Sequence, residues 1–182
     1  MTVDDSFDNT RTCTMTTPLK QAILGDLDHE IATTRRVLER APDEHYGWKP
    51  HEKSWTLGEL CAHLQNLLYW QRLILEQDEF DLAASPPPRT VPASRDELLR
   101  GFDENKKAVD AAVADVDDAA LGQTWTLRNG DQVIFAQPRA GVLRGMGISH
   151  MVHHRGQLSV YLRLLDVPVP AVYGPSADES PF

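Results

Sequence analysis

Four histidines in this chain have the spacing of a metal site built on helices. His150, His153 and His154 lie within one five-residue stretch, and His63 falls on the apolar stripe of an earlier stretch. Residues four apart on a helix share one face, with their Cβ atoms roughly 5 to 6 Å apart, so the imidazoles of His150 and His154 can converge on one ion. The third ligand would come from another helix, and His63 is the candidate there. Spacing alone does not exclude His153 as a ligand.

Three neutral imidazoles favour a divalent transition metal, and we expect zinc or nickel. Such ions accept nitrogen ligands, whereas magnesium and calcium prefer oxygen. Tetrahedral zinc with three protein ligands keeps a fourth position for water. The pKa of that water falls to roughly 7, and a thiolate or a carbonyl oxygen could displace it. The alternative is a metal-free bundle whose buried histidines are all held by hydrogen bonds.

Other signatures of catalysis are missing from the sequence. The residue after His150 is not the glutamate that a zincin requires, and no Glu-x-x-His motif of a carboxylate-bridged dimetal site is present. His29 is expected on a solvated, charged helix face. Cys61 lies two residues from His63 and is expected to be a small buried hydrophobe. Glu30 could face the metal, but we assign no general base.

Composition narrows the class of protein further. The 182 residues fit one domain, and a net charge of −9 argues against binding to a phosphate backbone. No apolar run is long enough to span a bilayer or to serve as a signal peptide, so we expect a cytoplasmic protein with no membrane or nucleic-acid partner. Two cysteines make no disulfide framework. We expect residues 1–16 to be disordered and residues 17–182 to form the folded domain.

The apolar periodicity predicts four long helices that would position the histidines. They cover residues 17–40, 56–77, 94–118 and 140–165. Capping-box spacing marks the start of the second helix at Thr56 and of the third at Ser94. Asn129-Gly130 between two β-prone runs predicts a hairpin before the last helix. The proline-rich connection at residues 86–92 suits a long crossover between two helices.

Three stretches of the chain resemble the DinB family, also called the DinB/YfiT-like metalloenzymes. They are Trp48-Lys49-Pro50 through Ser54-Trp55-Thr56 to Glu59-Leu60-Cys61-Ala62-His63-Leu64, His150 to Leu158 with its His-His-Arg-Gly-Gln-Leu run, and Tyr173 to Glu179. The resemblance implies an all-α, up-down-down-up four-helix bundle, here with a small inserted β-hairpin, that is commonly a homodimer. It also implies a divalent metal held by His63, His150 and His154, with His153 turned away.

The same resemblance sets the functional expectation. Some relatives look like transferases or isomerases that use a low-molecular-weight thiol such as bacillithiol or mycothiol. We therefore expect a metal-dependent enzyme that activates such a thiol or water, of the thiol S-transferase, isomerase or hydrolase type, with a small-molecule substrate. The competing hypothesis is a non-catalytic, metal-stabilised binding or stress-response module. An open coordination position within a pocket would favour the enzyme.

Overall fold

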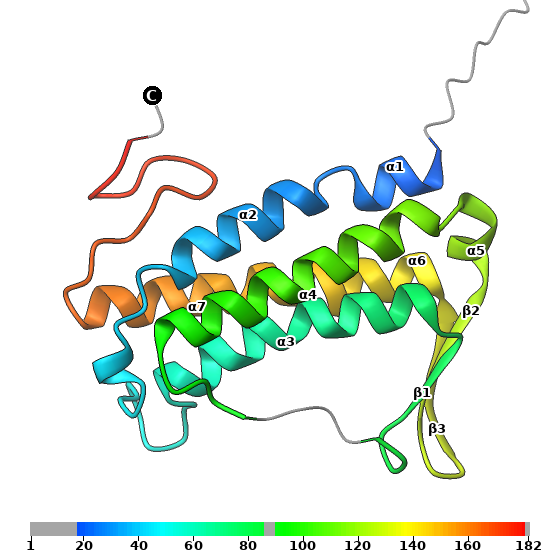
Figure 1. The fold of residues 1–182 in the computed structure, drawn as a ribbon, viewed down its shortest axis with the longest axis horizontal. Coiled ribbons are helices and arrows are strands. Elements are labelled where there is room, and N and C mark those ends of the chain that lie inside the picture. The colour runs from blue at the N-terminus through cyan, green and yellow to red at the C-terminus, as the bar shows by residue number, and fades with distance from the viewer. Residues whose placement is uncertain (1–17, 86–89, 181–182) are drawn as a thin grey trace, which may run out of the picture.

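Helices form most of the structure, a computed structural model that describes residues 18–85 and 90–180 (Figure 1). The expected disorder of residues 1–16 lies outside the described residues. Within the described ranges no helix is both long and apolar enough to cross a membrane. The helices are α1 (Leu19–Leu24), α2 (Leu27–Leu38), α3 (Leu57–Glu76), α4 (Arg95–Asp115), α5 (Asp118–Gly122), α6 (Arg139–Val142) and α7 (His150–Leu164), with a 3₁₀ turn at Asp43–His45 and a π-helical segment at Leu143–Ser149.

The helix α3 is the centre of the helical layer. It packs against α4 over most of its length and against α7 and the π-helical segment on another side, while α2 contacts α7 and α4. Figure 1 shows α2, α3, α4 and α7 lying side by side. Because α3 has neighbours on several sides, its buried residues are not confined to one stripe. They include Leu57, Leu60, Cys61, Leu64, Leu67, Leu68 and Ile74.

The starts of the two central helices follow the predicted caps. The Thr56 hydroxyl accepts a hydrogen bond from the Glu59 amide, and the Glu59 carboxylate accepts one from the Thr56 amide, so both halves of the capping box are formed. At α4, Ser94 accepts from the Glu97 amide, but the Glu97 carboxylate accepts from the amide of Ala93. The bonds to the amides of Glu59 and Glu97 satisfy donors that the first turn of each helix leaves unpaired.

The prediction of one unbroken first helix at residues 17–40 was wrong. The chain forms two helices, because α1 ends at Leu24 and α2 begins at Leu27. Gly25 has a low helix propensity, and Asp26 adopts φ −96° and ψ −4°, which departs from regular α-helical geometry. The start of α1 is held from outside, since the Asp118 carboxylate accepts hydrogen bonds from the amides of Leu19 and Lys20.

A small three-stranded sheet accompanies the mostly helical fold, where the sequence analysis expected only a hairpin. The predicted hairpin is present as β2 (Thr124–Asn129) and β3 (Gln132–Pro138), which pair antiparallel, with Gly130 at φ 59° in the turn. The strand β1 (Glu79–Asp81) pairs parallel to β2 and was not predicted. Its three residues are too few to show an alternating pattern. Phe80 is buried and packs edge-on against Trp70 of α3.

Candidate metal centre

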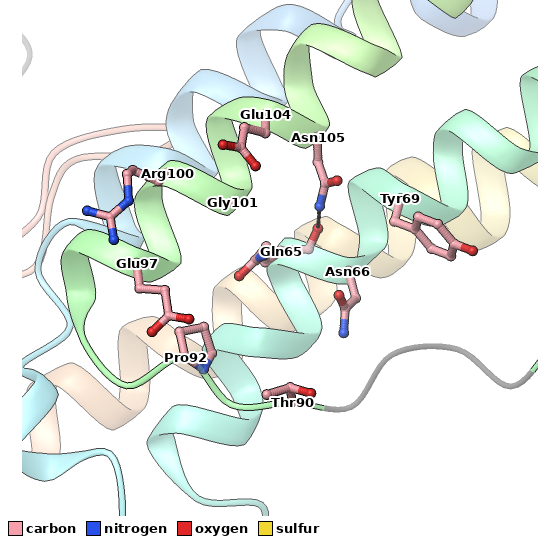
Figure 2. Close-up of a pocket in the computed structure, with 10 residues that line it drawn as sticks. All are labelled: Gln65, Asn66, Tyr69, Thr90, Pro92, Glu97, Arg100, Gly101, Glu104 and Asn105. Atoms are coloured by element: carbon pink, nitrogen blue, oxygen red, sulfur yellow. Dashed lines mark hydrogen bonds between the residues drawn. The ribbon is translucent and has the colours of Figure 1, made fainter.

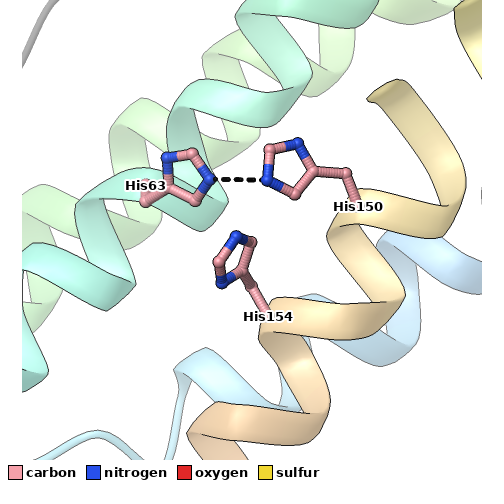
Figure 3. A group of neighbouring side chains, drawn as sticks. All are labelled: His63, His150 and His154. Atoms are coloured by element: carbon pink, nitrogen blue, oxygen red, sulfur yellow. Dashed lines mark hydrogen bonds between the residues drawn. The ribbon is translucent and has the colours of Figure 1, made fainter. Parts of the chain in front are cut away.

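Three of the predicted histidines converge between α3 and α7 (Figure 3). His63 comes from α3, and His150 and His154 come from the first two turns of α7. Each can offer a ring nitrogen to one point, since these nitrogens lie within 4.8 Å of one another. The Nε2 atoms of His63 and His150 are 3.3 Å apart. Residues 87 positions apart in the sequence thus form one cluster.

The segment before α7 brings the two helices close together next to the cluster. It is π-helical over Leu143–Ser149 and leads directly into His150; such widened turns occur often at functional sites. A Cβ at Gly147 would lie 3.0 Å from Cγ of Gln71 on α3. Glycine therefore permits a close approach here, three residues before His150. The sequence predicted a helix through this region but not its π-helical form.

Burial favours the neutral form of all three imidazoles. Burial, together with smaller effects of the neighbouring His154 and His150, lowers the pKa of His63 to about 4. Burial also lowers the pKa of His150, against the effect of a hydrogen bond with the backbone of Met146. The pKa of His154 is lowered mainly by burial, against the effect of its hydrogen bond with Gln157. Neutral imidazoles have the free lone pair that a metal ion requires.

The geometry of the cluster fits a transition metal. Bonds of 2.0 to 2.1 Å at tetrahedral angles place two nitrogen ligands roughly 3.4 Å apart, close to the 3.3 Å between the Nε2 atoms of His63 and His150. Nitrogen is the donor that zinc, nickel, copper and ferrous iron accept. The three residues therefore can hold a divalent ion of this class. They supply three ligands, fewer than the four of a closed tetrahedral site.

His153 takes a different position from the three clustered histidines. Its side chain is exposed, and its Nε2 lies 3.1 Å from Nε2 of Gln157. The Oε1 atom of the same glutamine lies 2.7 Å from Nδ1 of His154. The alternative that spacing left open, His153 as a ligand, thus has no support in the geometry, because its ring is not among the grouped donors.

An aromatic side chain that the sequence analysis did not assign to the site covers part of the cluster. The Trp55 indole stacks on the His154 ring at 5.5 Å between centroids and 20° between planes, and its edge contacts His63 at 4.9 Å. Nevertheless, 46% of Trp55 is exposed to solvent. Its carbonyl accepts a hydrogen bond from the Tyr161 hydroxyl at 3.2 Å, and Tyr161 packs edge-on against Trp48. Trp55 therefore forms a wall between the histidines and solvent.

Glu30 does not face the metal cluster, contrary to the possibility raised from the sequence. Its carboxylate is 2.7 Å from the Arg155 guanidinium and accepts hydrogen bonds from the Tyr173 hydroxyl at 2.8 and 2.9 Å. The side chains of Arg155 and Glu30 are 2% and 10% exposed, so the pair is buried and joins α2, α7 and the C-terminal tail. Cys61 is fully buried as predicted, and burial raises the pKa of its thiol to about 12.

A polar cleft between α3 and α4 is separate from the histidine cluster (Figure 2). The Asn105 side-chain amide donates to the Gln65 carbonyl at 3.2 Å, and the Gln65 side chain lies against Gly101, where a Cβ would meet it at 2.3 Å. None of the three clustered histidines lines this cleft. Its lining residues are Gln65, Asn66, Tyr69, Thr90, Pro92, Glu97, Arg100, Gly101, Glu104 and Asn105.

Comparison with known sequences connects nearly the whole chain to one family. The sequence profile described as "DinB family" matches residues 15–181. The uncharacterised protein YrdA of Bacillus subtilis (strain 168) is 28% identical to the chain over 155 residues, which make up 84% of this chain and 86% of YrdA.

Solved structures of similar fold include two DinB-like proteins. A DinB-like protein from Bacillus cereus aligns with a TM-score of 0.63 at 23% identity, covering 84% of this chain and 97% of that protein. The DinB-like protein YjoA from Bacillus subtilis aligns with a TM-score of 0.59 at 17% identity, covering 82% of this chain and 94% of that protein. These similarities establish the fold, which agrees with the sequence match.

Proposed function

The chain belongs to the DinB family, and we propose that it is a metal-dependent enzyme whose His63, His150 and His154 bind one divalent transition metal, zinc or nickel. The observation that carries the proposal is the convergence of three imidazoles from two helices, with their nitrogens within 4.8 Å. Burial lowers the pKa of all three and so favours their uncharged form near neutral pH, which means that the three ligands themselves do not offset the charge of the ion.

The chemistry that we propose is activation of a low-molecular-weight thiol or of water. A bound divalent metal with an open position would supply the Lewis acidity that ionises such a group near neutral pH. The three imidazoles would hold the ion, and Trp55 shields one side of the cluster from solvent. Glu30, which the sequence analysis considered as an acid facing the metal, is engaged by Arg155 instead. These features support a thiol S-transferase, isomerase or hydrolase.

A small molecule with a planar or apolar part is the substrate that the surroundings favour. Trp55 presents a half-exposed aromatic surface beside two of the three histidines. Such a surface binds planar or apolar groups by stacking and by exclusion of water. An electrophile with an apolar body would lie against Trp55 while its reactive atom faces the histidines.

A metal-stabilised module without turnover is the second candidate function. One observation favours it: the proposed ligands come from two helices, so a bound ion would also crosslink α3 to α7. Binding of an ion only to the folded state raises the unfolding free energy. In that case metal would raise the melting temperature, but electrophilic substrates would not be consumed.

The test begins with elemental analysis of protein purified without a histidine tag. We expect near-stoichiometric metal in the wild type and in His29→Ala, which replaces an exposed histidine of α2, and loss of metal in His63→Ala, His150→Ala and His154→Ala. Unchanged metal content in His154→Ala would contradict the site, as would a wild type that stays metal-free after reconstitution with zinc or nickel.

Activity is then assayed on the metal-loaded protein. Thiol transfer is screened with bacillithiol or mycothiol and a panel of electrophiles, and hydrolysis is screened without thiol. We expect turnover that depends on His63, His150 and His154 and does not depend on the exposed His29. Full metal loading without turnover in either screen would favour the non-catalytic module.

We also propose the up-down-down-up connectivity and a homodimer. Support for the connectivity comes from the chain direction in Figure 1, where α3 and α4 both run toward the end of the bundle that carries the sheet, while α2 and α7 run away from it. The homodimer rests on the resemblance to the family, and sedimentation analysis of the purified protein would test it.

A further inference from the structure

We infer that Gln157 is a positioning residue that sets the tautomer of His154, so that Nε2 of His154 faces the cluster with a free lone pair. This inference adds a positioning residue to the proposed metal site. Its prediction for metal affinity rests on that proposed site. The observation behind it is the short contact, 2.7 Å, between Oε1 of Gln157 and Nδ1 of His154.

The direction of this hydrogen bond follows from the chemistry of the two groups. An amide oxygen only accepts hydrogen bonds, so the proton of the contact must be on Nδ1 of His154. A neutral imidazole carries one proton in total, which leaves Nε2 of His154 as the unprotonated nitrogen. That nitrogen is the one required for a ligand beside the Nε2 atoms of His63 and His150. Free neutral imidazole prefers the opposite tautomer, so the hydrogen bond has to reverse an intrinsic preference.

His153 contacts the other end of the glutamine amide. Nε2 of Gln157 lies 3.1 Å from Nε2 of His153, and an amide nitrogen only donates. In this arrangement Gln157 donates to His153 with one end and accepts from His154 with the other. Rotation of the amide by half a turn would preserve these contacts only if both imidazoles changed tautomer. The exposed His153 therefore has a role beside the cluster without being one of its proposed ligands.

The two clustered histidines of α7 use different hydrogen-bond partners outside the cluster. For His150, the hydrogen bond outside the cluster is with the backbone of Met146. His154 lies one turn further along α7 and uses Gln157, three residues on, on the same side of the helix. Hydrogen bonds to metal-bound histidines of this kind fix the ring orientation and increase the basicity of the ligand.

The first test measures the tautomer in metal-free protein by nitrogen NMR of the histidine rings, at about pH 8, where the imidazoles are neutral. We expect the Nδ1–H tautomer for His154 in the wild type and in Gln157→Glu, whose carboxylate also accepts. We expect a shift toward Nε2–H in Gln157→Leu. The matched control is Gln21→Leu, at an exposed glutamine of α1 far along the chain, and it should leave the tautomer unchanged.

The second test measures metal affinity by competition with a zinc chelator. Gln157→Leu should bind zinc about 10- to 100-fold more weakly than the wild type, the usual effect of losing such a partner. Gln157→Glu should restore the affinity, and Gln21→Leu should retain it. Gln157 is exposed, so we expect Gln157→Leu to fold, and its backbone amide spectrum would verify this.

Two outcomes would overturn the inference. One is an Nε2–H tautomer of His154 in the wild type, which would mean that the amide is reversed. The other is an unchanged tautomer in Gln157→Leu. Because the tautomer is measured without metal, either result is decisive whether or not the protein binds zinc. Absence of zinc binding in a wild type with the expected tautomer would instead contradict the proposed function.

Discussion

Acidification of the metal-free protein should weaken the fold through His63. The folded-state pKa of His63 is lowered to about 4 from an ordinary value of 6.5, mainly by burial. Between these two values the unfolded chain binds a proton that the folded chain does not. The free energy of unfolding therefore falls as the pH drops below 6.5 and levels off below about 4.

The size of the effect can be worked out for a change from about pH 7.5 to about pH 5. Linkage between a pKa of 6.5 in the unfolded chain and about 4 in the folded chain gives a loss of about 2 kcal/mol for His63 alone. This is an upper bound, because the side chain is only partly buried, and residual solvation reduces the loss toward about 1 kcal/mol. The lowered pKa values of His150 and His154 act in the same direction.

The assay is urea denaturation of chelator-treated protein at both pH values. His63→Gln removes the titrating ring, so its unfolding free energy should fall less on acidification than that of the wild type, by about 1 to 2 kcal/mol. The matched control is His29→Gln, which replaces an exposed histidine of α2 and should behave like the wild type. Equal pH dependence in the wild type and His63→Gln would refute the reasoning that burial keeps His63 neutral.

Two further predictions concern the stability of the fold. Glu30→Gln leaves Arg155 buried without its charge partner, so the free energy of unfolding at about pH 7.5 should fall by about 3 kcal/mol; a urea midpoint close to that of the wild type would contradict this. Gly58→Ala should cost about 1 to 3 kcal/mol, because its Cβ would lie 3.0 Å from Cβ and 3.1 Å from the carbonyl oxygen of Tyr46. Gly122→Ala, where nothing lies within 4 Å of the new Cβ, is the control in thermal denaturation, and equal melting temperatures for the two variants would disprove the clash.

Local signals explain which parts of the fold the sequence predicted. The cap at Thr56 and the turn at Gly130 depend on residues within a few positions of one another, so both were predicted and are present. The strand β1 was missed because the segment becomes a strand by pairing with β2, which follows more than forty residues later. The interruption at Gly25–Asp26 and the π-helical form before His150 were missed for a related reason. Apolar periodicity continues through both and does not report backbone geometry.

The contacts of the candidate site also fall into those that the sequence predicts and those that only the tertiary structure decides. The spacing of His150 and His154 determined by itself that two imidazoles share one face of a helix, since neighbours at that distance meet on any regular helix. Only the packing of α3 against α7 decided that His63 joins them. The exposure of His153 and its contact with Gln157, which also bonds to His154, depend on the arrangement of side chains in the folded protein. The same holds for the pairing of Glu30 with Arg155. Contacts within one turn follow from helix geometry, whereas contacts between distant segments depend on how the whole chain packs.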